Sequence, residues 1–247
     1  MFTAGKYKFT HAYKPESERY INDPILDGDK KLIAVHEAGH VLGMITLLGE
    51  IPDYIYNNTH NGILSGEVHF RIGKQLQTAD TLINHVAIML GGWVAEGFVF
   101  GSDNRTTGSE NDLRMATGIL LNALKTAGVD EHPYFWRGNA EPGDSNRLHD
   151  REGALDARAK KLLDTAQARM EHSLNQHLAL FRNLVSAIHK EKYLNKNAIE
   201  KILMETNFQP LISQAIQLSN TRDAAFNKLM EGYLTEIVEP QNIEKAA

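Results

Sequence analysis

Apolar residues recur at helical spacing in several stretches of the chain. In residues 30–48 an apolar stripe runs from Leu32 to Ile45, and Gly49 and Pro52 then end the pattern. Thr78 or Asp80 is expected to cap the next such stretch. The predicted helices cover residues 30–48, 78–98, 109–128, 154–190 and 197–204, and a further amphipathic helical stretch is predicted at 206–247.

Short apolar runs lie between the first two predicted helices. In residues 53–72 these runs are broken by asparagine and glycine, which predicts two or three short strands or a hairpin. Residues 1–26 and 129–153 show no clear period and are predicted to be irregular. The pattern therefore predicts a mainly α fold with a small β-sheet, an α+β architecture.

The composition narrows the classes of function. A net charge of -5 argues against attraction to nucleic acid or to anionic lipid, because phosphate binding needs clustered lysine and arginine. Since the chain has no cysteine, histidine and carboxylate side chains are its only strong metal ligands. The most apolar window, 82–100, contains Asn84, His85 and Glu96 and is typical of a buried core helix rather than a membrane span. Because residues 1–20 contain no secretory signal, we expect a cytoplasmic protein that binds neither nucleic acid nor membrane.

His36, Glu37 and His40 form an H-E-x-x-H motif inside the first apolar stripe. Positions i and i+4 of an α-helix lie one turn apart on one face, so both imidazoles can point to the same metal ion. Glu37 projects beside them, where it can reach a metal-bound water as a general base without being a ligand. The alternative is a surface helix that carries two histidines by chance. Apolar neighbours such as Ala34 and Val41 argue against it, because they predict a buried helix in which unpaired imidazoles would be costly.

The spacing alone leaves the third ligand open. A metzincin would have a third histidine where Thr46 stands, which excludes that subclass. Asp112 is favoured because it lies in the first turn of a predicted helix, where backbone N–H groups stabilise an anion. The same position also fits a capping carboxylate that follows Ser109. The candidates downstream of the motif are Glu67, His69, Glu96, Glu110 and Asp112.

Three segments resemble the peptidase domain of the FtsH-type zinc proteases, in order and in character: VHEAGH at 35–40, LGGWVAEG at 90–97 and TTGSENDLRMAT at 106–117. Residues 159–203 also resemble the helical subdomain of that family, so the resemblance covers about residues 30–205. The sequence departs from the family at Trp93, where the family has arginine, and at Gly97, where it has an acidic residue.

The resemblance implies that His36, His40 and Asp112 bind a zinc ion (Zn2+) and that Glu37 is the general base. Glu96 matches a family glutamate that supports the metal site, in line with the need to orient a ligating imidazole. The implied activity is that of a zinc metalloendopeptidase that hydrolyses peptide bonds of peptides or unfolded polypeptides. The implied fold has a zincin-like metal helix beside the small sheet, followed by a C-terminal helical subdomain.

The expected domain organisation is a leader at 1–27, the peptidase domain at 28–205 and a helical extension at 206–247. FtsH-type proteins carry a transmembrane anchor and an AAA ATPase module before the peptidase, whereas this sequence shows neither and has no G-x-x-x-x-G-K-[ST] segment. We therefore expect cleavage of peptides and unfolded chains without ATP, or an AAA ATPase partner that supplies substrate. The resemblance also implies a homo-oligomeric ring, a hexamer. The alternative function is a zinc-binding scaffold or regulatory subunit of an ATPase–protease assembly, without turnover.

Residues 63–70 are predicted to form the edge strand that zincins use to pair with extended substrate through main-chain hydrogen bonds. The alternative is that these residues belong to the core of the sheet. His69 would point to the cleft in the first case, but a single histidine on an apolar strand is more often structural, and we favour that interpretation.

Overall fold

The structure is a computed structural model that describes residues 6–12, 27–60, 63–71, 78–129 and 154–209, together with 217, 220–228 and 230. The strands are β1 (Lys6–Ala12), β2 (Tyr54–His60), β3 (Ile63–Arg71) and β4 (Tyr193–Asn195). The α-helices are α1 (Asp27–Gly43), α2 (Ala79–Met89), α3 (Gly91–Phe100), α4 (Glu110–Thr126), α5 (Ala154–Gln176), α6 (Leu178–Lys190) and α7 (Lys196–Glu205). Shorter turns are the π-helical η2 (Met44–Leu48) and the 3-10 helices η3 (Ser102–Asn104) and η4 (Thr107–Ser109).

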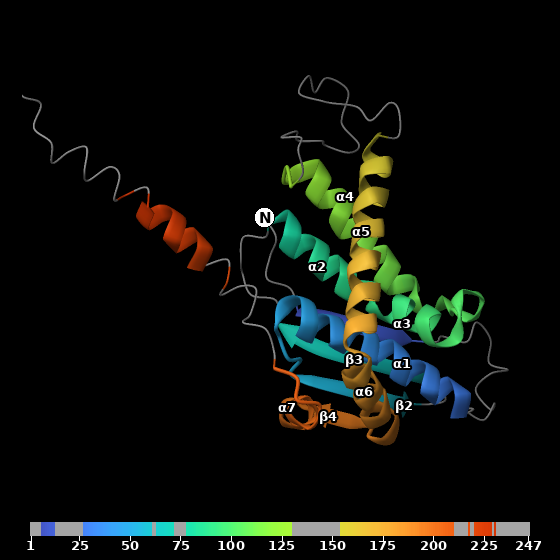
Figure 1. The fold of residues 1–247 in the computed structure, drawn as a ribbon. Helices are drawn as coiled ribbons and strands as arrows, with labels where there is room; N and C mark the ends of the chain where they lie inside the picture. Colours follow the sequence, from blue (N-terminus) through green and yellow to red (C-terminus); the bar gives the residue numbers. More distant parts are fainter. Residues whose placement is uncertain are drawn as a thin grey trace, which may run out of the picture.

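The fold is mainly α with one small antiparallel sheet, which confirms the predicted class. The strand order is β1-β3-β2-β4. Ile55 of β2 lies opposite Val68 of β3, and both side chains are buried in the same core as α1. Helix α1 contacts this sheet and also packs against α3, α5 and α6 (Figure 1). The central position of α1 explains why its apolar stripe is nearly continuous.

Helix α1 and the turn η2 together form one continuous apolar stretch. Residues Asp29–Leu48 are long and apolar enough to cross a membrane, yet 83% of their most apolar window is buried inside the protein. A core helix of a globular domain has the same properties. The predicted helix at 30–48 is therefore confirmed, with a start three residues earlier and a π-helical last turn.

The leader was predicted to be irregular, and this is wrong for residues 6–12, which form β1 and pair with β3 along its whole length. The prediction that 63–70 forms an edge strand is wrong for the same reason, because β3 lies between β1 and β2. The missed signal is the alternation of polar and aromatic residues in KYKFTHA, which has the period of a strand.

The single helix predicted at 78–98 is two helices. Thr78 caps α2 as expected, in a capping box with Thr81. Helix α3 then begins at Gly91 and is bent by 51° from α2. The bend brings Gly91 against Gly39 of α1, where an added Cβ on Gly39 would lie 2.7 Å from the Gly91 carbonyl carbon. A glycine pair is a common site of a helix kink, and here it permits backbone-to-backbone packing of α1 and α3.

Three further elements differ in detail from the prediction. Ser109 precedes α4, but its side chain makes no capping hydrogen bond, so the predicted capping box is wrong. The helical stretch 154–190 is divided at His177 into α5 and α6. The break predicted before the last short helix is β4, which pairs with β2. Of the predicted loop 129–153, only Val129 lies within the described residues, and in the tail 220–228 are helical and exposed.

Candidate metal centre

Helix α1 places two imidazoles side by side in the interior. His36 and His40 lie one helical turn apart, their ring centroids are 4.8 Å from each other, and the rings are nearly perpendicular. Neither side chain is more than 1% exposed. Burial of two polar rings requires that each finds polar partners.

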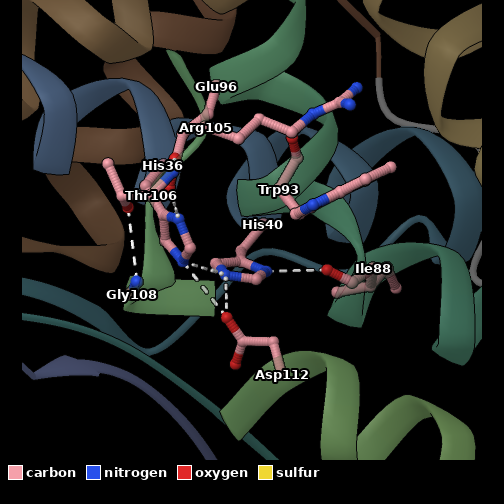
Figure 2. Close-up of polar contacts among 9 residues, drawn as sticks. All are labelled: His36, His40, Ile88, Trp93, Glu96, Arg105, Thr106, Gly108 and Asp112. Atoms are coloured by element: carbon pink, nitrogen blue, oxygen red, sulfur yellow. Dashed lines mark hydrogen bonds and ion pairs between the residues drawn. The ribbon is translucent and has the colours of Figure 1, made fainter. Parts of the chain in front are cut away.

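Asp112 reaches the two imidazoles from the first turn of α4 (Figure 2). Its Oδ2 lies 3.1 Å from His36 Nε2 and 3.4 Å from His40 Nε2, and the two Nε2 atoms are 3.0 Å apart. Four ligand atoms at tetrahedral zinc, each 2.0–2.1 Å from the ion, would be separated by about 3.3 Å. The three donor atoms therefore have the spacing of three corners of such a site, and this group could hold a metal ion.

The other ring nitrogens have acceptors that define the tautomers. His40 Nδ1–H donates to the carbonyl oxygen of Ile88 over 2.7 Å, and His36 Nδ1–H donates to Glu96 Oε1 over 2.7 Å. With each Nδ1 protonated, the Nε2 of a neutral imidazole carries a lone pair. Two lone pairs and a carboxylate oxygen within 3.4 Å of one another repel unless a proton or a metal ion lies among them. This donor set fits a metal ion.

The loop between α3 and α4 contacts Glu96 at the carboxylate oxygen that does not face His36. The backbone N–H of Thr106 donates to Glu96 Oε2 over 2.8 Å. The preceding residue, Arg105, lies over the Trp93 ring with its Cζ 3.7 Å from the ring centroid, and its Nε–H donates to the Trp93 carbonyl. Gly97 makes room for this guanidinium, since a Cβ there would overlap it. The two departures from the family pattern thus occur at one contact, which positions the loop that supports Glu96.

Glu37 is fully buried next to His36. Neither of its carboxylate oxygens has a hydrogen-bond partner among the described residues, and Asp112 Oδ1 is in the same state there. Gly66 of β3 passes directly against the Glu37 carboxylate, so that a Cβ at this glycine would overlap it. A buried carboxylate without partners is costly and marks a site that is completed by another molecule or ion.

Burial and the neighbouring ionisable side chains shift the pKa values of His36, Glu37 and Asp112. Burial opposes a charge on His36, but hydrogen bonds to Asp112 and Glu96 outweigh it and raise the pKa of His36 to about 10. Burial raises the pKa of Glu37 to about 8. The pKa of Asp112 is lowered, because the neighbouring imidazoles outweigh the effect of burial. The carboxylates of Glu37, Glu96 and Asp112 thus stabilise a positive charge on His36. A bound metal cation would balance the same negative charge.

The structure separates Asp112 from the other candidates for the third ligand. Glu67 accepts a hydrogen bond from the Tyr54 hydroxyl over 3.0 Å. His69 stacks on the ring of Tyr54 at 4.7 Å between centroids and lies 3.2 Å from an Asp53 carboxylate oxygen, which favours the structural interpretation. Glu110 is exposed, and Glu96 contacts His36 through Nδ1, the nitrogen that faces away from the donor group.

Several residues of the site were not found from the sequence. Gly92 packs against the His36 ring, and a Cβ there would overlap it. Thr106 and the Arg105–Trp93 contact act through Glu96. The doubled glycine and the aromatic residue at 93 were visible in the sequence, but only the bend between α2 and α3 shows what they touch.

The comparison with known proteins agrees with this geometry. The model of peptidase family M41 matches residues 24–202. The ATP-dependent zinc metalloprotease FTSH 11, chloroplastic/mitochondrial, of Arabidopsis thaliana is 27% identical over 187 residues, which cover 73% of this chain and 22% of that protein. The ATP-dependent zinc metalloprotease FtsH 1 of Alkaliphilus metalliredigens is 30% identical over 159 residues, covering 60% of this chain and 25% of the relative.

The chain thus spans about a quarter of the length of these curated relatives. The family match covers most of the sequence and includes α1, α3 and α4, which carry the donor group. It confirms the resemblance to the FtsH-type peptidase domain. This chain belongs to peptidase family M41.

Proposed function

We propose that this protein is a zinc-dependent endopeptidase that hydrolyses peptide bonds in unfolded polypeptides. One observation carries the proposal: Nε2 of His36, Nε2 of His40 and Oδ2 of Asp112 lie 3.0–3.4 Å apart, beside the buried and unpartnered carboxylate of Glu37. Membership of a peptidase family and the word zinc in the names of its relatives support the choice of reaction and metal.

In this proposal His36, His40 and Asp112 hold the zinc ion. When bound, zinc supplies Lewis acidity to a water molecule and to the scissile carbonyl group. Glu37 accepts the proton of the attacking water and transfers it to the leaving amine nitrogen. Its burial keeps bulk water away from the carboxylate. Glu96 fixes the His36 ring, because its second oxygen is held by the Thr106 N–H.

The decisive experiment replaces the general base while keeping its shape. We expect Glu37→Gln to lower cleavage of fluorescently labelled casein by about 10²–10⁴-fold, the usual contribution of a general acid–base group. Zinc content should stay near that of the wild type, because Glu37 is not a ligand in this proposal. Glu110→Gln, a change at an exposed glutamate of the same region, is the matched control and should retain activity. A fully active Glu37→Gln protein would refute the mechanism.

A second experiment tests the ligand role of Asp112. Asp112→Ala removes one of three donors, so the metal content measured by elemental analysis should fall. An unchanged zinc stoichiometry would assign the role to another group. If the wild type holds zinc and cleaves neither casein nor unstructured peptides, alone or with an AAA ATPase, the scaffold function replaces the proposed one.

The quaternary structure and the ATPase partner are also proposals. The relatives are named ATP-dependent, and that property is theirs. We propose that this chain forms a homo-oligomeric ring and receives unfolded substrate from an AAA ATPase. Light scattering of the purified protein tests the ring, and the rate of casein cleavage with and without an added AAA ATPase and ATP tests the partner.

A further inference from the structure

The outer side of β3, by which we mean the strand edge that is not paired with β2, is the surface from which an extended chain would reach the candidate metal centre. Strand β3 contacts α1, and its Gly66 passes against the Glu37 carboxylate. The inner side of β3 is paired with β2. A polypeptide that added itself as a strand could therefore pair only with the outer side, where its backbone would run beside Glu37.

In this structure the outer side of β3 is occupied by the N-terminal strand of the same chain. Residues of β1 pair with β3 in antiparallel register from Lys6 opposite Arg71 to Ala12 opposite Ser65. The register places His11 opposite Gly66, the glycine that covers Glu37. Strand β1 also contacts α4, the helix that carries Asp112, and η4, the turn that precedes it.

Cleavage of a polypeptide requires some segment to move. The side chains of His36, Glu37, His40 and Asp112 are at most 1% exposed, so no substrate carbonyl can approach them in this conformation. Strands β2 and β3 each have neighbours on both sides, and α1 and α3 belong to the core. Of the four described strands, β1 and β4 lie at the edges with one partner each, and only β1 pairs with β3, so its release frees the edge of β3 without breaking any other strand pairing.

We propose that β1 is an intramolecular occupant of the peptide-binding edge of β3, and that it must leave before a substrate polypeptide can pair there. The inference rests on the proposed peptidase function and adds its regulation. Since β1 uses main-chain pairing, the competing ligand is an extended polypeptide backbone rather than a particular side-chain sequence.

This arrangement has a kinetic signature. An occupant that competes with substrate raises the apparent KM by the inverse of the fraction of time that the edge is open, and it leaves kcat unchanged. If β1 is detached for a tenth of the time or less, its removal should lower KM at least about tenfold. A strand that only completes the sheet would give no such selective change in KM.

A disulfide that locks β1 onto β3 in the full-length chain tests whether β1 must leave before cleavage. Directly opposite residues of an antiparallel pair have Cα atoms about 4.5–5.5 Å apart, within the range of a disulfide. Lys6→Cys combined with Arg71→Cys would provide the only two thiols, because the chain has no cysteine. We expect the oxidised protein to lose casein cleavage at least about tenfold and the reduced protein to regain it. The two single cysteine variants, treated with the same oxidant, are the controls.

The opposite change detaches β1. Lys8→Pro with Phe9→Pro removes two successive N–H groups, one of which must face β3 in an antiparallel strand. This variant should have a KM at least about tenfold lower, with unchanged kcat. Lys8→Ala with Phe9→Ala keeps both N–H groups and separates main-chain pairing from side-chain loss. An oxidised lock as active as its reduced form, or proline and alanine variants with the KM of the wild type, would overturn the proposal.

A binding measurement separates this inference from the proposed function. In the Glu37→Gln background, fluorescence anisotropy of a labelled peptide of residues 5–13 reports pairing without cleavage. Tighter binding to the proline variant supports the occupied edge even if no variant cleaves casein. Cleavage of casein by a wild type whose peptide affinity equals that of the proline variant supports the peptidase and refutes the occupant.

Discussion

Gly66 of β3 allows Glu37 to occupy its buried position. A Cβ built on Gly66 would lie 2.5 Å from Glu37 Cδ and 2.6 Å from Glu37 Cγ, whereas ordinary contacts begin near 3.4 Å. All three of its nearest neighbours are atoms of this one side chain. One carboxylate oxygen of Glu37 would lie nearer still, so Gly66→Ala requires the Glu37 carboxylate to retreat by at least about 0.9 Å, or β3 to move away from α1 by a similar distance.

The size of the expected effect follows from that displacement. A misplacement of about 1 Å in a catalytic group can lower the rate about 10²-fold. We expect Gly66→Ala to lower kcat/KM for casein by about this factor and to leave zinc content unchanged, because the three atoms nearest to the new methyl group all belong to Glu37, which is not a ligand in the proposed site. Gly118→Ala is the matched control, since a Cβ at this position of α4 meets nothing within 4 Å. It should retain full activity and gain about 0.5–1 kcal/mol of stability.

The assay compares initial rates at equal zinc occupancy, with urea unfolding of each variant to exclude loss of fold. If Gly66→Ala cleaves casein as fast as the wild type, then either the Glu37 carboxylate is not the base or its position is not set by β3. Either result would refute the proposed role of Glu37 or the role of Gly66 in positioning it.

Three further predictions concern neighbouring parts of the structure. Gly92→Ala would press a methyl group on the His36 ring, so zinc affinity measured by competition with a chromogenic chelator should fall about 10–100-fold, and an unchanged affinity would contradict the packing. Arg105→Ala removes the contact with the Trp93 ring, so it should lower zinc affinity and should lower the unfolding free energy in urea by about 1–2 kcal/mol. Arg105→Lys should restore neither quantity, because lysine lacks the planar guanidinium, and full restoration by lysine would contradict this role. Burial lowers the pKa of His85 from 6.5 to about 4. As the pH falls, His85 is therefore protonated in the unfolded chain before it is protonated in the folded protein. The stability that neutral His85 contributes above pH 6.5 is lost as the pH falls towards 4. Between pH 7.5 and pH 5.0 this loss is about 2 kcal/mol at most and should be absent from His85→Gln, so equal pH dependence of the two proteins in urea would rule it out.

The sequence predicted those parts of the fold that depend on local pattern. The apolar stripe of α1, the capping residue Thr78 and the hairpin of β2 and β3 all follow from spacing along the chain, and all are confirmed. The sequence did not predict features that depend on contacts between elements distant along the chain. The bend at Leu90 exists because α3 packs its first glycines on α1, and nothing in the apolar pattern of 78–98 indicates it.

The candidate site shows the same division. The pairing of His36 with His40 needs only helical geometry, so the motif was sufficient to predict it. Asp112 has two physically reasonable roles in its sequence context, and the choice between them came from the resemblance to the family. The structure shows Ser109 without a capping hydrogen bond and Asp112 turned to the imidazoles. Arg105 was overlooked because its contact with Trp93 joins residues from a helix and a loop whose relative placement no local rule provides.

The contact between Gly39 and Gly91 has a consequence for how the protein acquires its metal. Main chain meets main chain there, and Ile88, whose carbonyl oxygen accepts the His40 Nδ1–H, is itself fully buried. The donor atoms are thus held by packed backbone and not by the ion, unlike in small zinc modules that unfold without metal. Removal of zinc by a chelator should then abolish the peptidase activity, while the circular dichroism spectrum and the cooperative melting of the protein persist. Adding zinc back should restore the activity without a refolding step.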